Sequence, residues 1–163
     1  MDGIVLSSAQ FTDGGGIPLS MAHLSVGGEN RSPQLVWGDL PPSTRSLAIT
    51  CWDPDAPTTV GFSHWVRFDI PSSRTEMPEG AGTEAGDWVD GFTDFGESHY
   101  GGMAPPPGDD PHRYQFTLYA LDVPSLELGA TTTYARFRFA SRAHVLATGT
   151  LTGRFGLPKD SGR

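Results

Sequence analysis

The sequence predicts a mainly β protein that forms a single domain. Glycine and proline, with 21 and 14 residues, make up about a fifth of the 163 residues, against an average of about 12% for the two together, so turns are frequent. Short apolar runs lie between these turn residues, which is typical of strands of ordinary length. The length fits one domain, and no stretch resembles a linker between two cores. We therefore expect one domain over residues 1–163, with termini that fray at 1–3 and 158–163.

Six apolar runs are expected to form strands. In chain order they are Ile4–Leu6, Leu19–Leu24, Leu35–Trp37, Leu47–Trp52, His64–Ile70 and His112–Leu121. Residues 72–100 show no sustained period of 2 or 3.6, so we expect a long, partly ordered loop over the sheet. Only Thr132–Leu146 has a helical pattern, with Thr132 or Thr133 as its N-cap. The run Thr148–Leu151 is then expected to be the last strand.

The charge balance excludes two classes of partner. With 11 basic and 19 acidic residues the chain has a formal net charge of −8, whereas nucleic acid and anionic membrane surfaces need a positive field. The chain has no run of 18 apolar residues and no basic, apolar leader, so we expect neither a membrane span nor a signal peptide. The single Cys51 cannot form an internal disulfide, and a small buried side chain is favoured there over a reactive thiol. These observations predict a cytoplasmic protein with no nucleic-acid partner and no integral membrane contact.

Three predicted strands carry an ionisable side chain at the end of an apolar row. Period-two alternation gives the rows His112, Tyr114, Phe116, Leu118 and Ala120; His64, Val66, Phe68 and Ile70; and Asp53, Cys51, Ile49, Leu47 and Arg45. If these strand ends meet, Asp53, His64, His112 and Tyr114 line a pocket with apolar walls and a few polar groups, as small-molecule sites do. Periodicity alone leaves the alternative that each histidine is a singly hydrogen-bonded residue of the core or the sheet edge.

The usual catalytic and metal motifs are absent. There is no Gly-x-Ser-x-Gly elbow, no Walker-type loop and no His-Glu-x-x-His. Imidazole and carboxylate suit zinc or iron, but the residues that could ligate show no local ligand spacing; they are Asp53, His64, His99, His112 and His144. We therefore expect no metal and no cofactor. In the run Asp53-Pro54-Asp55-Ala56-Pro57 an aspartate can bond the backbone two residues on, and we favour that turn role for Asp55.

Several motifs in a fixed order carry a family resemblance. They are Asn30-x-Ser32-Pro33-x-Leu35-x-Trp37, Asp53-Pro54-Asp55-Ala56-Pro57, His64-Trp65-Val66, Tyr100-Gly101-Gly102, Pro105-Pro106-Pro107-Gly108 and Pro111-His112-Arg113-Tyr114. From about residue 20 onward the chain resembles the phosphatidylethanolamine-binding protein (PEBP) family, and in particular its short bacterial and archaeal branch, the Raf-kinase-inhibitor-like proteins. The resemblance implies a large central antiparallel β-sheet of Greek-key type, a smaller flanking sheet and one or two short helices.

The resemblance also implies an anion-accepting pocket at one end of the sheet. Its ligand-binding residues in this chain would be Asp53, His64, His112 and Tyr114, with a wall from Tyr100, Gly102, Pro105 and Pro106 and with Phe62 at the mouth. Two imidazoles and a phenol offer donors to a phosphate or carboxylate oxygen, and histidine can gain charge when an anion arrives. Arg113 projects to the opposite face, where we expect it to pair with Asp55 or another acid. Met103-Ala104 stands where many bacterial relatives have Pro-Cys, so any role for that thiol is absent.

Three functions are compatible with these residues. The favoured one is binding of a small anionic or zwitterionic ligand, such as a phosphate, a carboxylate or a phospholipid headgroup, with a regulatory role. The alternative is a small-metabolite isomerase, cyclase or lyase that uses Asp53, His64 and His112 as general acid and base. A weaker alternative, inhibition of a protease or kinase, rests on family analogy alone. The resemblance also makes a homodimer an expectation, with an interface at Trp65, Trp88 and Phe92, and it names no protein partner.

Overall fold

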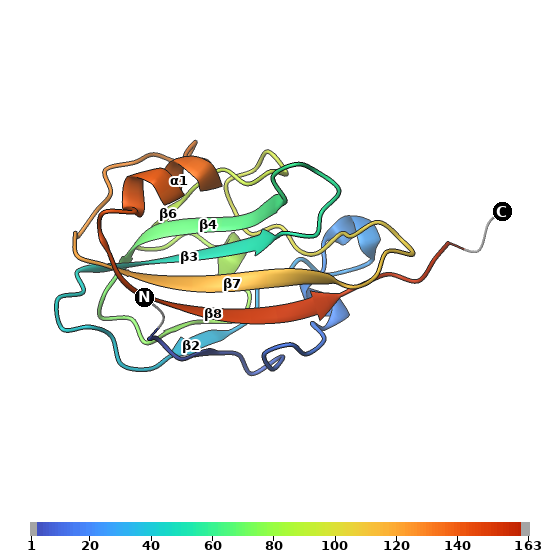
Figure 1. Ribbon diagram of the computed structural model, residues 1–163, viewed down its shortest axis with the longest axis horizontal. Coiled ribbons are helices and arrows are strands. Elements are labelled where there is room, and N and C mark those ends of the chain that lie inside the picture. Colours follow the sequence, from blue (N-terminus) through green and yellow to red (C-terminus); the bar gives the residue numbers. More distant parts are fainter. Residues whose placement is uncertain (1–2, 161–163) are drawn as a thin grey trace.

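The computed structural model describes residues 3–160 as two antiparallel sheets and one α-helix (Figure 1). The five-stranded sheet has the order β6 (Val89–Asp90), β4 (Phe62–Pro71), β3 (Ser46–Asp53), β7 (His112–Leu121) and β8 (Val145–Phe155). The three-stranded sheet has the order β1 (Leu6–Ser7), β2 (Leu35–Trp37) and β5 (Glu76–Met77). The predicted mainly β fold with a large central sheet and a smaller flanking one is confirmed.

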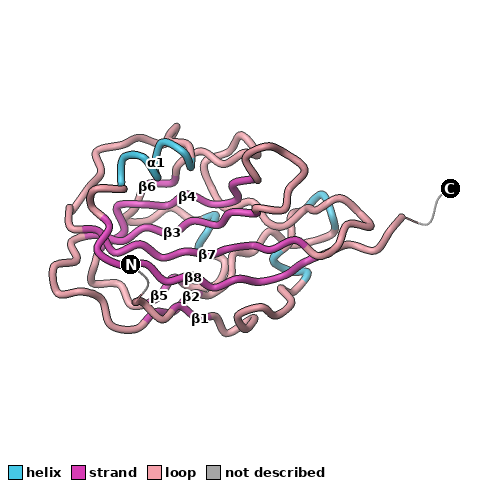
Figure 2. The backbone as a smooth tube through the Cα atoms, viewed as in Figure 1, coloured by secondary structure: helices cyan, strands magenta, loops and turns pink. Residues whose placement is uncertain are grey.

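The order of the central strands follows from a long connection. β3, β4 and β6 lie side by side in the sheet in chain order, with β5 of the small sheet between β4 and β6 in sequence, whereas β7 returns to pair with the free edge of β3. Three consecutive strands followed by a fourth beside the first is a Greek-key arrangement. Figure 2 shows that much of the chain between the strands is loop, and several of these loops gather at the end of the sheet where β3 stops and β7 starts.

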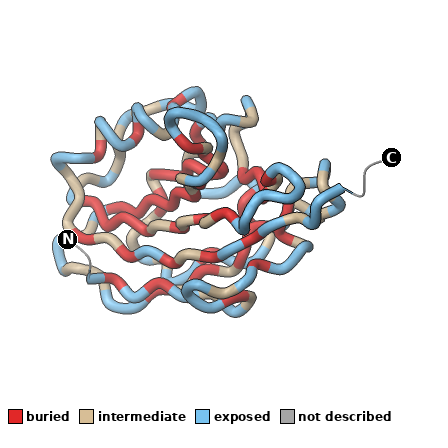
Figure 3. The backbone as a smooth tube through the Cα atoms, turned by 45° about the vertical axis from the view of Figure 1, so that its right-hand side comes forward, coloured by how far each residue is buried: buried red, intermediate tan, exposed pale blue. Residues whose placement is uncertain are grey.

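Both faces of the central sheet are covered, which explains why β3 is buried along its length. One face packs against the small sheet and the N-terminal segment, through Leu47, Ile49 and Cys51 among others. The other face packs Ala48 of β3 near Phe137 of α1 (Tyr134–Ser141), within a second apolar cluster. A strand between two apolar layers reads as a continuous hydrophobic run, and Figure 3 shows the buried residues concentrated along the central strands.

Strand β4 departs from simple alternation because it is bulged. Cys51 pairs with Trp65 while Trp52 pairs with Ser63, so His64 is an extra residue in β4. A bulge places two residues opposite one and re-aims a side chain. Trp65 therefore belongs to the core cluster on the Cys51 face, while Val66 and Phe68 pack in the cluster beneath α1. The predicted row of His64, Val66, Phe68 and Ile70 on one face is wrong, and a second register shift between β3 and β4 places Ile70 in the cluster of Trp65.

Two further element predictions need correction. The run Leu19–Leu24 forms no strand; it contains two 3-10 turns, η1 (Leu19–Met21) and η2 (Leu24–Val26), the second of which ends at Gly27 with a φ of 88°. The helix is shorter than predicted, because β8 already begins at Val145 rather than Thr148 and continues to Phe155. Thr133 is the N-cap, since its side chain accepts a hydrogen bond from the backbone N–H of Arg136.

The remaining predictions about the chain have mixed outcomes. Residues 72–100 are largely loop, interrupted by β5, β6 and the 3-10 turn η3 (Ala81–Thr83). Of the predicted interface residues, Trp65 is fully buried and contributes nothing to an exposed interface, Trp88 is half-buried and Phe92 is partly exposed. Within residues 3–160 no helix has the length and apolar character needed to cross a membrane. The predicted fraying at 1–3 and 158–163 falls partly outside the described residues and stays a prediction.

Candidate functional site

A pocket of about 300 Å³ opens at the end of the central sheet. The end of β3 meets the starts of β4 and β7 there, because neighbouring strands are antiparallel. Its ionisable side chains are Asp53, His64, His112 and Tyr114, and its other lining residues are Ala56, Pro57, Thr58, Phe62, Phe95, Ala104, Pro105 and Pro106. The structure thus brings together the four polar residues that the strand ends and the family resemblance had indicated.

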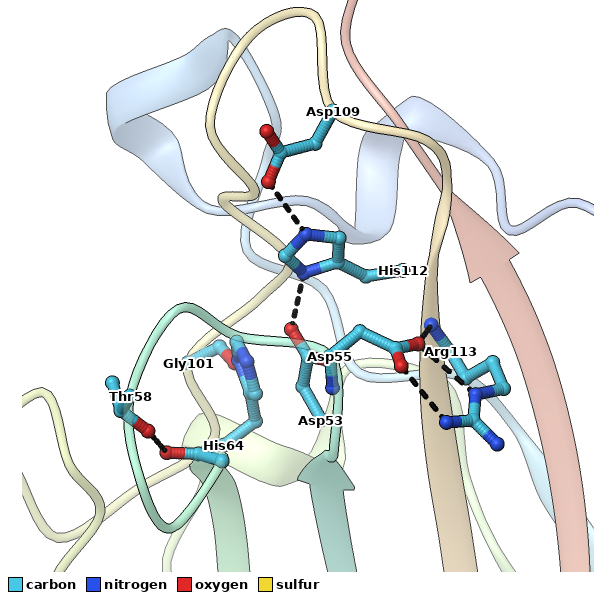
Figure 4. A network of polar contacts seen from close by, with 9 residues as sticks. Asp53, Asp55, Thr58, His64, Gly101, Asp109, His112 and Arg113 are labelled. Carbon is cyan, nitrogen blue, oxygen red and sulfur yellow. Dashed lines mark hydrogen bonds and ion pairs between the residues drawn. The ribbon is translucent and has the colours of Figure 1, made fainter.

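His112 lies between two carboxylates (Figure 4). Its Nδ1 is 2.7 Å from Oδ2 of Asp53, and its Nε2 is 3.0 Å from Oδ2 of Asp109. Ionised carboxylates only accept hydrogen bonds, so both ring nitrogens donate and the ring is an imidazolium. Burial of the ring disfavours its charge, but the hydrogen bonds and charges of Asp53 and Asp109 outweigh burial and raise the pKa of His112.

The Asp53 carboxylate is fixed by a second contact. Its Oδ1 accepts the backbone N–H of Asp55 at 2.8 Å, which is the turn interaction that the sequence analysis assigned to Asp55 itself. Asp55 instead binds Arg113, accepting from Nη2 at 2.8 Å, from Nε at 3.0 Å and from the backbone N–H at 2.8 Å. These hydrogen bonds lower the pKa of Asp55 to about 2. The expected pairing of Arg113 with Asp55 is confirmed, and it ties the turn after β3 to the start of β7.

His64 is held in the opposite protonation state. Its Nδ1 lies 2.8 Å from the carbonyl oxygen of Gly101, and because a carbonyl only accepts, Nδ1 carries the proton. Burial lowers the pKa of His64 to about 4, so the ring is neutral near pH 7 and Nε2 bears a lone pair. The ring is packed between aromatic neighbours, with centroids 5.0 Å from Phe62, 5.4 Å from Phe95 and 5.2 Å from Tyr114.

Tyr114 carries an unpartnered hydroxyl into the pocket. The oxygen is buried and has no hydrogen-bond partner among the described residues, although the Asp53 carboxylate lies near enough to influence it. Burial, reinforced by the charge of Asp53, raises the pKa of Tyr114, so the hydroxyl keeps its proton. Leaving a buried hydroxyl unbonded costs about 1–3 kcal/mol. A polar ligand atom placed beside it would remove that cost.

Similarity to known proteins places the chain in a family. A family model described as phosphatidylethanolamine-binding protein matches residues 7–156. The chain belongs to the PEBP family. The UPF0098 protein YbhB of Escherichia coli is 38% identical over 92% of this chain and 98% of its own length. A UPF0098 protein of Methanothermobacter thermautotrophicus is 41% identical over 92% of this chain and 97% of its own length.

Solved structures of PEBP relatives share the fold. The crystal structure of Escherichia coli YbcL, described as a new member of the mammalian PEBP family, superposes with a TM-score of 0.90 at 33% identity, covering 94% of this chain and 98% of YbcL. The PEBP homologue CT736 of Chlamydia trachomatis gives a TM-score of 0.82 at 31% identity, covering 95% of this chain and 98% of CT736. These similarities confirm the resemblance to the bacterial and archaeal branch.

The PEBP motif residues divide into those that line the pocket and those that lie behind it. Phe62, Pro105 and Pro106 line it, whereas Tyr100 and Gly102 are absent from its wall. The Tyr100 hydroxyl donates to the backbone carbonyl of Met21 at 2.8 Å, and the Gly102 N–H donates to Asn30 Oδ1 at 2.7 Å. These two residues fix the segment that presents the Gly101 carbonyl to His64. Their contact with a ligand stays a prediction without support from the geometry.

Two residues that contact the pocket histidines, Phe95 and Asp109, were not predicted from the sequence. Phe95 lies in the loop before Tyr100, stacks on His23 at a centroid distance of 4.6 Å and covers His64 edge-on. Asp109 lies in a run of turn residues, and only its spacing of three from His112 could have indicated it.

Cys51 is buried, with its pKa raised by that burial, as favoured for a core residue. His99 and His144 lie away from the pocket, paired with Glu97 and Asp122, and no metal-binding group of side chains occurs within residues 3–160.

Proposed function

We propose that this PEBP family member binds a small ligand that joins a phosphate or carboxylate group to an apolar part, and that binding serves a regulatory role. The observation that carries the proposal is the buried Tyr114 hydroxyl, which has no hydrogen-bond partner among the described residues, inside a pocket with mainly apolar walls. Small-molecule sites have this composition, with apolar walls and few convergent polar groups. A phospholipid headgroup is one ligand of this class.

The protonation states assign a role to each polar residue. The Tyr114 hydroxyl is an uncommitted donor for an oxyanion. The His112 imidazolium, whose two N–H groups are bonded to Asp53 and Asp109, contributes positive charge at the wall of the pocket. Neutral His64 offers an acceptor at Nε2, and Asp53 offers carboxylate lone pairs, so both suit an ammonium group on a zwitterion. Pro105 and Pro106 supply a rigid apolar wall without competing N–H donors.

A titration followed by backbone NMR tests this proposal. We expect phosphate, acetate and phosphoethanolamine at millimolar concentration to shift the signals of His64, His112 and Tyr114 in a saturable way. The variant Tyr114→Phe should weaken binding at least tenfold, since a hydrogen bond to a charged group contributes roughly 1.5–3 kcal/mol. The control Tyr119→Phe removes a phenolic hydroxyl that bonds Thr50 on the opposite face of β7 and should leave affinity unchanged. Absence of saturable shifts with all three compounds would refute the proposal.

A second candidate function, acid–base catalysis on a small metabolite, has one specific observation in its favour. His64 and His112 share a pocket, and their environments drive their pKa values in opposite directions, which is the pattern expected of a base and an acid. Turnover of a candidate metabolite should then be lost in His64→Asn and retained in His144→Asn, a histidine paired with Asp122 away from the pocket. Equal turnover in wild type and His64→Asn would remove this candidate.

A further inference from the structure

His112 separates the apolar pocket from a second, polar cleft. The cleft has a volume of about 520 Å³ and its lining includes Asp109, Arg113 and Arg154, whereas Asp109 does not line the apolar pocket. Since Nε2 of His112 bonds Asp109, the ring presents Nε2 toward the cleft and Nδ1 toward Asp53 (Figure 4). The Nε2 donor of the imidazolium is therefore already occupied by a side chain of the same protein.

The two carboxylates on His112 differ in how firmly they are held. The Asp53 side chain is 4% exposed, lies 2.7 Å from Nδ1 and has its other oxygen bonded to the backbone of Asp55. The Asp109 side chain is 43% exposed and lies 3.0 Å from Nε2, and its Oδ1 accepts no bond from a described residue. Exposed ion pairs contribute little because water competes for both partners. Asp109 is thus the carboxylate that can move away from His112.

Release of Asp109 requires no rearrangement of the loop. Residues 106–111 are all exposed. The backbone of the loop is held separately, by the Gly108 N–H on the carbonyl of Leu157 at 3.0 Å and by the Asp109 N–H on the carbonyl of Pro106 at 3.2 Å. A rotation about χ1 of Asp109 moves its carboxylate off His112 while these bonds stay in place. The exposed side chain has open solvent into which it can turn.

The local charge determines which group can replace the Asp109 carboxylate on Nε2 of His112. Asp53, His112 and Asp109 together carry one net negative charge, which opposes the arrival of a further anion. Exchange of the Asp109 carboxylate for a ligand oxyanion on Nε2 keeps the imidazolium paired on both sides. Arg113 is committed to Asp55, but the neighbouring Arg154, its cross-strand partner in register, forms no ion pair with any described residue and borders the same cleft. An oxyanion on Nε2 would lie in the favourable field of that guanidinium.

We propose that Asp109 is an internal competitor for the oxyanion of the ligand: its carboxylate occupies Nε2 of His112 in the free protein and must leave before a phosphate or carboxylate can bind there. The inference rests on the proposed function and adds the residue that limits the affinity for anions. A site that is open in only a tenth of the molecules binds tenfold more weakly than its intrinsic affinity. Asp109 would set the ligand concentration at which the protein responds.

Isothermal and NMR titrations with inorganic phosphate and with acetate at pH 6.5 test the proposal on three variants. Asp109→Ala vacates Nε2 and should bind both anions at least tenfold more tightly than wild type. Asp109→Asn keeps a weaker, uncharged acceptor and should give an intermediate gain. The control Asp110→Asn removes the same charge one residue away, at a side chain that makes no bond to His112, and should change affinity less than twofold. Inorganic phosphate represents ligands with a phosphate group, and acetate represents ligands with a carboxylate group.

The outcomes separate the two proposals. Equal gains in Asp109→Asn and Asp110→Asn would reduce the effect to general electrostatics and overturn the role of Asp109. Unchanged or weaker binding in Asp109→Ala, with saturable binding in wild type, would also overturn it while leaving the proposed function intact. If neither wild type nor any folded variant binds phosphate or acetate, the proposed function itself fails.

Discussion

His64 provides the sharpest quantitative prediction, because its burial couples protonation to unfolding. The native pKa is about 4 and the unfolded value is 6.5, so the neutral ring stabilises the fold and the full difference corresponds to about 3 kcal/mol. Stability from a lowered histidine pKa is present above the unfolded pKa and is lost as the pH falls toward the native one. Between pH 7 and pH 5 the expected loss is about 2 kcal/mol. His112 acts with the opposite sign, since its raised pKa adds stability that fades as the pH rises above 6.5.

Urea unfolding of wild type and His64→Asn at pH 7 and pH 5 isolates this contribution. The asparagine amide can still donate to the Gly101 carbonyl, as Nδ1 does, but it does not titrate. The loss of unfolding free energy between the two pH values should be about 2 kcal/mol larger in wild type than in the variant, while His112 and the carboxylates cancel from the difference. The reasoning would be refuted by identical pH dependences. It would also be refuted by a wild-type His64 ring that titrates near pH 6.5 in ¹H–¹⁵N spectra, a measurement that needs no variant.

Two further substitutions test the supports of the pocket. Asp53→Asn removes the buried carboxylate charge that bonds Nδ1 of His112. The pKa of His112 should fall, and the protein should lose roughly 3 kcal/mol of stability. A His112 titration curve identical to that of wild type would contradict the assigned pairing. Gly102→Ala places a Cβ against the Met21 carbonyl oxygen and should lower the free energy of unfolding in urea by about 1–3 kcal/mol. The control is Gly129→Ala, where a Cβ meets nothing within 4 Å. Equal stability of the two variants would exclude the close contact at Gly102.

The sequence predicted the four polar residues of the pocket, but it did not predict in every case why they lie there. Asp53 and Tyr114 follow from alternation in β3 and β7, because those strands are regular at their pocket ends. His64 reaches the pocket for a different reason, since a bulge in β4 breaks the alternation that was used to place it. A bulge depends on the pairing of two strands, and period-two patterning in one strand contains no record of it. The family motif, which fixes His64 by position, was the better guide there.

The parts that could not be predicted lie in aperiodic segments. Phe95 and Asp109 come from loops where no hydrophobic period operates, so only the folded chain reveals that they cover His64 and pair with His112. The run from Leu19 is apolar enough to suggest a strand, but Pro18 precedes it and the first turn begins there, with the Met21 N–H bonded to the Pro18 carbonyl. Tertiary packing decided these cases, and local propensity did not.

A crystal structure of the protein with phosphoethanolamine tests the central claim most directly, because it shows what bonds the Tyr114 hydroxyl. We predict that an oxygen of the ligand lies within hydrogen-bond distance of that hydroxyl, in the pocket between His64 and His112. A structure at saturating phosphoethanolamine in which the Tyr114 hydroxyl contacts only water or protein, with the pocket free of ligand, would contradict the claim.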